Sequence, residues 1–342
     1  MSSLIQKNPN GYRTVLVTGG GGYVGSALVP ELLRNGYKVK VVDVFWYGRE
    51  VLAGVADHPN LELVTLDIRN AARMREELVG QDVVIHLACI SNDPSFDLAP
   101  DLGTSINRDA FSPLLDGAIA SGVQRFVYAS SSSIYGVQPK PNVVEETPPL
   151  PLTDYSKFKL ECEHTLLGHR EVGGMERVIV RPATVCGYAP RLRLDVVVNI
   201  LTAHALVNRK IRIFGGAQLR PNIHVKDMVR AYLALLAAPR DKVDCEAFNV
   251  GYQNLKVEEI ATLVRETIGD TSIELECLPS DDNRSYHINS DKIQKTLDFS
   301  PKHNVEDAIA SLVEAFADGR VTNPMSDTRY YNLKRMQEID AQ

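Results

Sequence analysis

Two residues in the stretch 155–167 could perform acid–base chemistry. The pattern of this stretch predicts a helix, and Tyr155 and Lys159 stand four residues apart in it, so both side chains project from one face. A nearby ammonium group favours the phenolate form of a tyrosine and lowers its pKa from an ordinary value of about 10. Such a tyrosine can take a proton from an alcohol while a hydride leaves the same carbon. The alternative interpretation is an amphipathic helix with a surface tyrosine and lysine.

A run of serines precedes that helix. Residues 130–133 are all serine, and they come directly after the predicted strand 125–129 and before Ile134-Tyr135-Gly136. A hydroxyl at the carboxyl end of a strand can hold a substrate oxygen against a tyrosine. The alternative is a polar turn.

A third chemical signal is a glycine-rich turn near the start of the chain. A short apolar strand at 15–17 is followed by Gly19, Gly22 and Gly25 and then by a predicted helix at 26–33. The first glycine permits the turn, the second lets the backbone approach a phosphate, and the third lets the helix pack closely. Backbone N–H groups and the positive end of the helix dipole then point at one spot, which suits a pyrophosphate. An ordinary glycine loop is the alternative.

The next predicted strand, 38–43, ends in Asp43. A carboxylate at this place accepts hydrogen bonds from the ribose hydroxyls and repels a 2′-phosphate, which favours NAD over NADP. Arg49 follows a few residues later and would soften that preference.

Strand and helix patterns alternate from residue 14 to about 190. This alternation predicts an α/β fold with a Rossmann-type, doubly wound parallel sheet, whose ligands lie beyond the carboxyl ends of the strands. We expect residues 1–190 to form an NAD-binding domain, with core elements returning at about 225–250. Residues 191–342 are expected to form mainly a smaller, mixed α/β, substrate-binding lobe. The pattern leaves open whether the polar stretch 325–342 is ordered. Further predicted strands are 61–66, 82–88 and 177–182, and further predicted helices are 70–79 and 105–121.

The composition is that of a globular protein. The chain has 342 residues, of which 44% are hydrophobic, and a formal net charge of −6, which argues against a nucleic-acid-binding surface. Its five cysteines form no CxxC pair, so we expect reduced thiols and no metal site. No apolar run approaches the roughly 20 residues of a membrane helix, and the first residues lack an apolar signal core. We therefore expect a cytoplasmic protein without a membrane or nucleic-acid partner.

Taken in order, these motifs resemble the extended short-chain dehydrogenase/reductase superfamily, in its NAD-dependent nucleotide-sugar epimerase/dehydratase branch, and are UDP-glucose 4-epimerase-like. The resemblance covers roughly residues 12–320 and includes the segments 181–187 and 214–227. It implies NAD as cofactor and a nucleotide-diphosphate sugar as substrate. It also implies a homodimer formed through the helices around 105–121 and 155–170, although these helices could equally be covered within the chain.

The resemblance assigns roles to individual residues. The catalytic residues would be Ser131, Tyr155 and Lys159. The cofactor would be bound by Gly19, Gly22, Tyr23, Val24, Gly25, Asp43, Asp67, Ile68, Leu87, Ala88, Asn107, Tyr155, Lys159, Pro182 and Val185. The substrate would be bound by Ser131, Ser132, Thr184, Arg193, Asp195, Asn199, Arg220 and Arg284. Arg220 and Arg284 would clamp the substrate diphosphate, since guanidinium groups suit phosphate oxygens, and the alternative for each is a surface ion pair.

The chain departs from its relatives at the expected reaction centre. Ser132 and Ser133 occupy the positions where the sugar dehydratases carry an acidic pair, and the decarboxylases also tend to have an acid there. Ser133 also replaces the cysteine of the 3,5-epimerases, and Thr184 stands where many relatives have a sugar-contacting asparagine. Since the acids and the cysteine that those reactions use are absent, the hypothesis that remains is a 4-epimerase that acts through a 4-keto sugar. One alternative is a dehydrogenase or reductase acting on a 4-keto-6-deoxy nucleotide sugar, which would consume external NAD(P)H. Another is a non-catalytic NAD-binding protein.

Overall fold

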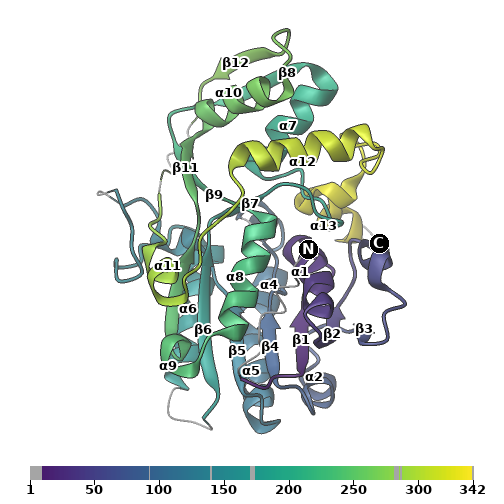
Figure 1. Ribbon diagram of the computed structural model, residues 1–342, viewed down its shortest axis with the longest axis vertical. Coiled ribbons are helices and arrows are strands. Elements are labelled where there is room, and N and C mark those ends of the chain that lie inside the picture. The colour runs from purple at the N-terminus through teal and green to yellow at the C-terminus, as the bar shows by residue number, and fades with distance from the viewer. Residues whose placement is uncertain are drawn as a thin grey trace.

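The computed structural model describes residues 10–91, 93–138, 141–169, 174–280, 285 and 287–340. Its centre is a seven-stranded sheet in the order β10-β6-β5-β4-β1-β2-β3, and every neighbouring pair is parallel (Figure 1). This arrangement confirms the predicted Rossmann-type α/β fold. The strands are β1 (Thr14–Thr18), β2 (Lys38–Asp43), β3 (Leu61–Thr65), β4 (Val83–His86), β5 (Arg125–Ala129), β6 (Glu176–Pro182) and β10 (Glu246–Val250).

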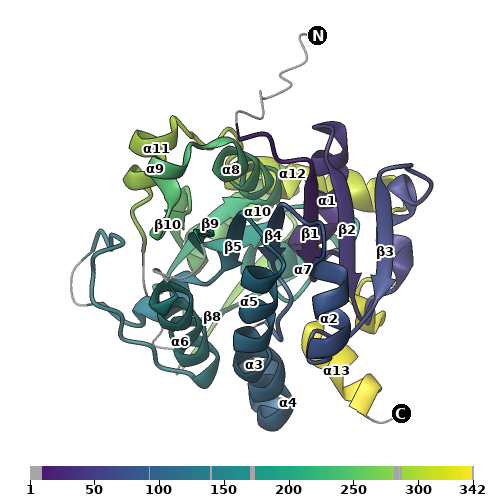
Figure 2. The same ribbon diagram turned by 90° about the horizontal axis from the view of Figure 1, so that it is seen from below.

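Helices cover both faces of this sheet, as Figure 2 shows. The middle of strand β1 is apolar because both faces of the sheet are buried there. Val15 and Val17 pack into the core on one face, and Leu16 packs into the core on the other. The first face carries α1 (Tyr23–Arg34), α8 (Val225–Ala237), α9 (Arg240–Val243) and α11 (Asp291–Leu297). The second face carries α2 (Ala71–Leu78), α5 (Phe111–Ala120) and α6 (Asp154–Gly168).

The chain between β4 and α5 is more broken than the sequence suggests. A single helix is expected over 105–121, but residues Ser105–Asp109 form a π-helical turn and α5 begins only at Phe111. Two short helices that the sequence pattern does not predict come before it, α3 (Asp93–Leu98) and α4 (Pro100–Thr104). They carry too few residues to show a helical period.

A second group of elements forms two small sheets with three helices around their own apolar core. Strand β9 pairs antiparallel with β11 and parallel with β7, and β8 pairs with β12 at one end of the long axis (Figure 1). These strands are β7 (Thr184–Cys186), β8 (Lys210–Phe214), β9 (Leu219–His224), β11 (Gln253–Lys256) and β12 (Glu274–Leu278). The helices are α7 (Val197–Asn208), α10 (Val257–Ile268) and α12 (Val305–Ala317).

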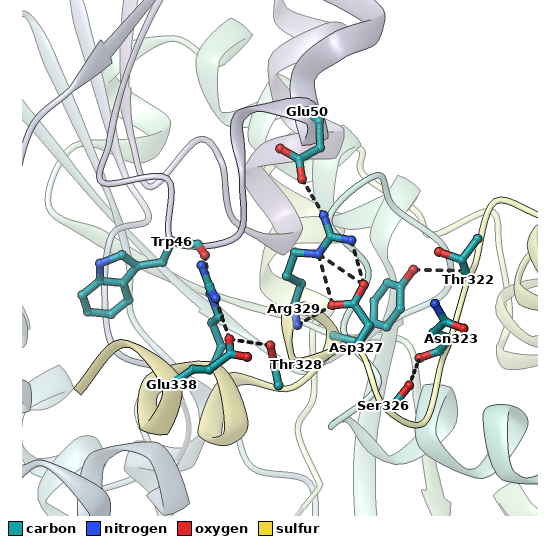
Figure 3. A network of polar contacts seen from close by, with 11 residues as sticks. Trp46, Glu50, Thr322, Asn323, Ser326, Asp327, Thr328, Arg329 and Glu338 are labelled. Atoms are coloured by element: carbon teal, nitrogen blue, oxygen red, sulfur yellow. Dashed lines mark hydrogen bonds and ion pairs between the residues drawn. The ribbon is translucent and has the colours of Figure 1, made fainter. Parts of the chain in front are cut away.

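The C-terminal segment returns to the first part of the chain, close to the loop after β2. It forms a 3-10 turn (Thr328–Tyr330) and helix α13 (Asn332–Asp340). Figure 3 shows the polar contacts that hold it: Arg329 pairs with Glu50 at 2.6 Å, and Arg335 donates from Nε to the Trp46 carbonyl at 2.6 Å. Residues 325–340 of the segment whose order the sequence leaves open are therefore folded against the first part of the chain.

Across the ranges given above, no helix combines the length and the apolar character needed to cross a bilayer.

Candidate active site

A cavity of about 470 Å³ opens at the carboxyl ends of the central strands. The cavity includes the ends of β1 and β4, and the strand order reverses between these two strands. Ligands bind at this position in open parallel sheets. Most of the residues singled out from the sequence line the cavity. They are Gly19, Gly22, Tyr23, Val24, Gly25, Asp43, Asp67, Ile68, Leu87, Ala88, Ser131, Ser132, Tyr155, Lys159, Pro182, Thr184, Val185, Arg193, Asp195 and Arg220.

The glycine turn fits a dinucleotide pyrophosphate. Gly19 has a φ of +74°, and a Cβ there would lie 2.6 Å from the Ala88 nitrogen. A Cβ on Gly25 would lie 2.6 Å from the Gly19 carbonyl oxygen. Helix α1 begins after Gly22, and no described side chain caps its N-terminus. The first N–H groups of α1 thus face a space that stays open because glycines bound it. A phosphate group fits such a space.

Asp43 lies at the end of β2, on the wall of the cavity. Its carboxylate accepts hydrogen bonds from the Gly21 N–H at 2.9 Å and the Phe45 N–H at 2.7 Å. Burial raises the pKa of Asp43, and these backbone N–H groups act in the opposite direction. The carboxylate therefore ties the glycine turn to the following loop, in the place expected for the ribose.

Ser131, Tyr155 and Lys159 meet at one end of the cavity. Ser131 and Tyr155 both line the cavity, and Lys159 lies with its Nζ 5.8 Å from the Tyr155 ring centre. Burial is the largest influence on the pKa of Tyr155 and raises it, whereas the Ser131 hydroxyl and the Arg193 guanidinium lower it. The ammonium of Lys159 donates to the Ala129 carbonyl at 2.6 Å, so the end of β5 orients it.

A buried ion pair fixes helix α6 behind these groups. Arg181 on β6 donates from Nη2 to Glu163 on α6 at 2.6 Å, and Ser130 also donates to Glu163. Arg181 further donates to the Tyr135 hydroxyl at 2.8 Å. The network joins β6, α6 and the serine run, and so sets the position of Lys159 relative to Ser131.

The expected substrate side contains a second pair of opposite charges. Arg193 donates from Nε to Asp195 at 2.8 Å and reaches the Ser91 hydroxyl at 3.4 Å. Arg220 lies on β9 and donates to the Leu219 carbonyl at 3.1 Å. Both guanidinium groups line the cavity.

Two of the predicted residues that the structure describes, Asn107 and Asn199, do not line the cavity. Asn107 is buried and bonds the Ile90 backbone from both ends of its amide, at 2.8 and 2.9 Å. Asn199 is buried and bonds the Gly187 N–H at 2.9 Å and the Tyr23 hydroxyl at 3.1 Å. Both side chains therefore hold segments next to the cavity lining in place through hydrogen bonds. Arg284 lies outside the described residues.

Several lining residues were missed by the sequence reasoning. Asp93 opens α3, Tyr47 follows Asp43, and Arg191 stands close to Arg193 in sequence. Asn332 and Met336 come from α13 at the far end of the chain. The arginine and the aspartate carried a usable signal, because charged residues beside predicted site residues are candidates for the same site. Asn332 carried none.

Comparison with known proteins agrees with this geometry. Residues 15–251 match the family described as "NAD dependent epimerase/dehydratase family". "Uncharacterized protein y4nG" of Sinorhizobium fredii is 35% identical over 225 residues, which are 65% of this chain and 53% of that protein, so the chain spans about half of its length. The dTDP-glucose 4,6-dehydratase of Streptomyces niveus is 27% identical over 326 residues, covering 90% of this chain and 93% of that enzyme.

Among solved structures, the UDP-glucose 4-epimerase of Thermotoga maritima with UDP-glucose has a TM-score of 0.81 and 28% identity, and covers 90% of this chain and 100% of that one. Epimerases and dehydratases thus both occur among the similar proteins. The resemblance inferred from the sequence is confirmed, and so is NAD as cofactor. The chain belongs to the NAD dependent epimerase/dehydratase family, within the extended short-chain dehydrogenase/reductase group.

Proposed function

We propose that this enzyme is a nucleotide-sugar epimerase that acts through transient oxidation at C4. The observation that carries the proposal is the placement of Ser131 and Tyr155 beside Lys159, in a cavity whose other wall is the glycine turn. This arrangement supports removal of a hydroxyl proton next to a bound dinucleotide.

The residues of the site would divide the work. NAD⁺, held by the glycine turn and Asp43, would supply the hydride acceptor for C4. Tyr155 takes the proton of the C4 hydroxyl and gives it back, and Ser131 holds the same oxygen. The positive charge of Lys159 would favour the phenolate form of Tyr155.

The sugar must turn between the two hydride transfers, so its diphosphate needs an anchor. Arg220 lines the cavity and would supply one guanidinium; Arg284 is proposed as the second from the resemblance alone. The homodimer remains a prediction of the same kind.

The serine run supports epimerisation over elimination. Ser133 donates from Oγ to Ser131 Oγ at 2.8 Å, and Ser132 is buried. Neither hydroxyl can act as the acid that loss of water requires at neutral pH.

One carboxylate favours a second candidate, a 4,6-dehydratase. Asp93 lines the cavity, accepts a hydrogen bond from Thr153 at 2.7 Å, and raises the pKa of Tyr155 by its charge. Because Asp93 lines the same cavity as Ser131 and Tyr155, it is the candidate acid in place of the serines. A reductase has no comparable observation in its favour.

The test is to incubate the purified enzyme with NAD⁺ and pooled UDP-, dTDP-, GDP- and CDP-sugars. NADH absorbance, product mass and sugar identity are followed together. A C4 epimer of unchanged mass without net NADH supports the proposal. Loss of water identifies the dehydratase, and net NADH formation or consumption identifies the dehydrogenase or reductase.

A further inference from the structure

Arg191 is a buried cation on the wall of the cavity that forms no ion pair with the described residues, although the charge of Asp195 raises its pKa. Its side chain is 3% exposed. Nη2 donates to the Asn332 side-chain oxygen, and the guanidinium lies 3.7 Å from the centre of the Tyr47 ring. Nε and Nη1 are buried, and neither has a hydrogen-bond partner among the described residues.

Two other buried arginines have a carboxylate partner: Arg125 pairs with Glu176, and Arg181 pairs with Glu163. The half-buried Arg193, two residues after Arg191, pairs with Asp195. Arg191 forms no ion pair within the described ranges, and burial lowers its pKa to about 10. A desolvated charge with unused donors is costly unless a ligand supplies the anion.

The backbone around Arg191 places this charge near the cofactor's phosphates. Its N–H donates to the Ser26 hydroxyl at 3.1 Å, and Ser26 lies in the first turn of α1, directly after the glycine turn. The ring beneath its guanidinium belongs to Tyr47, in the loop that follows Asp43. Arg191 thus spans from the helix N-terminus to the loop at the ribose end, where a dinucleotide would present its diphosphate.

Asn332 of α13 holds the guanidinium in this place. Its side-chain oxygen accepts from both Arg191 and the Tyr47 hydroxyl, and its amide donates to the Ser91 hydroxyl at 2.9 Å. Its backbone N–H donates to Asp195 at 2.9 Å. One residue of the C-terminal segment therefore connects three loops of the cavity.

We propose that Arg191, positioned by Asn332 and Tyr47, is a phosphate-binding residue of this cavity and takes the diphosphate of bound NAD. Planar guanidinium groups bind phosphate oxygens through two donors, and Nε and Nη1 are the two donors left over. The docked C-terminal segment is then part of the cofactor site. The proposal concerns binding alone, so it holds whether the enzyme epimerises or dehydrates its substrate.

The test measures ligand binding to cofactor-free enzyme by calorimetry, with NAD⁺, ADP, adenosine and UDP as probes. In Arg191→Gln, the dissociation constants of NAD⁺ and ADP are expected to rise at least about tenfold, because a charge-assisted hydrogen bond is lost. Adenosine and UDP are expected to bind as in the wild type. Arg212→Gln is the matched control, since Arg212 is an exposed arginine on β8, outside the lining of the cavity.

Arg191→Met separates binding from folding. Removing an unpaired buried charge should leave the melting temperature of the cofactor-free enzyme unchanged or raise it, while the increase caused by NAD⁺ should shrink. The proposal is overturned if NAD⁺ and ADP bind both variants as tightly as the wild type, or if adenosine binding weakens equally. A loss confined to UDP would assign Arg191 to the substrate and overturn its assignment to the cofactor.

Discussion

Ser131, directly beyond the carboxyl end of β5, lines the same cavity as Tyr155 in the first turn of α6 and lowers the pKa of that tyrosine. The glycine turn forms another part of the cavity wall. Burial raises the pKa of Tyr155, and positive charge and hydrogen bonding lower it. The tyrosine is therefore a group whose protonation depends on what binds beside it.

Tyr155→Phe should remove turnover but not cofactor binding. The ring and its packing stay, and only the proton acceptor is lost. General acid–base catalysis of this kind contributes about 10²–10⁴-fold, so kcat should fall by that factor. Retained NAD, measured after denaturation, should equal that of the wild type. Tyr252→Phe, at an exposed tyrosine, is the control; a kcat within about twofold of wild type for Tyr155→Phe would contradict the assignment.

Gly25→Ala should weaken NAD binding and destabilise the fold. The added Cβ would lie 2.6 Å from the Gly19 carbonyl oxygen, so the turn must shift. Overpacking of this kind costs about 1–3 kcal/mol, measurable by urea unfolding. Gly54→Ala is the control, since no described atom lies within 4 Å of a Cβ there. Equal stability and equal NAD affinity in the two variants would count against a tight phosphate cradle.

Glu163→Gln should destabilise the protein by about 3–5 kcal/mol. The substitution leaves Arg181 buried without its carboxylate, and the loss of a partner in a buried ion pair is expensive. Glu161→Gln, at an exposed position on the same helix, should change stability by less than about 0.5 kcal/mol. Chemical unfolding of both variants checks the difference, and a similar small effect at both sites would refute the role given to the network.

Asp227 should make stability depend on pH. Burial raises its pKa, but hydrogen bonds from Arg230 at 2.6 Å and from the His303 and Lys302 N–H groups outweigh this and hold the pKa below its usual value. A carboxyl with a lowered folded pKa stabilises the protein above the unfolded value of about 3.9, and this is lost as the pH falls through the folded pKa. The difference in melting temperature between wild type and Asp227→Asn should shrink from pH 6 towards pH 3. A constant difference would contradict the linkage.

The central sheet was predictable because its strands carry their own signal. Strand β2 runs from Lys38 to Asp43 and β5 from Arg125 to Ala129, as expected, since short β-branched and apolar runs bounded by polar residues mark buried parallel strands. The cavity position then follows from the parallel topology. The motifs could therefore be placed on strand ends without knowledge of any contact.

The rest of the site depends on contacts between residues far apart in sequence. Asn332 bonds the Tyr47 hydroxyl at 3.0 Å across a separation of 285 residues, and no local pattern marks it. Asn107 was expected beside the cofactor, but its amide is used by the Ile90 backbone. Residue type predicts the capacity to hydrogen-bond, and only tertiary packing decides which partner uses it.

The most direct test of epimerisation uses UDP-hexoses deuterated at C4, incubated with enzyme and NAD⁺ in ordinary water. We expect a C4 epimer that keeps its deuterium at C4 and its mass, with no free NADH. Because the same hydride leaves and returns while Tyr155 handles only the proton, solvent hydrogen should not enter C4. A product that has lost water, or deuterium that appears in free NADH, would contradict a 4-epimerase.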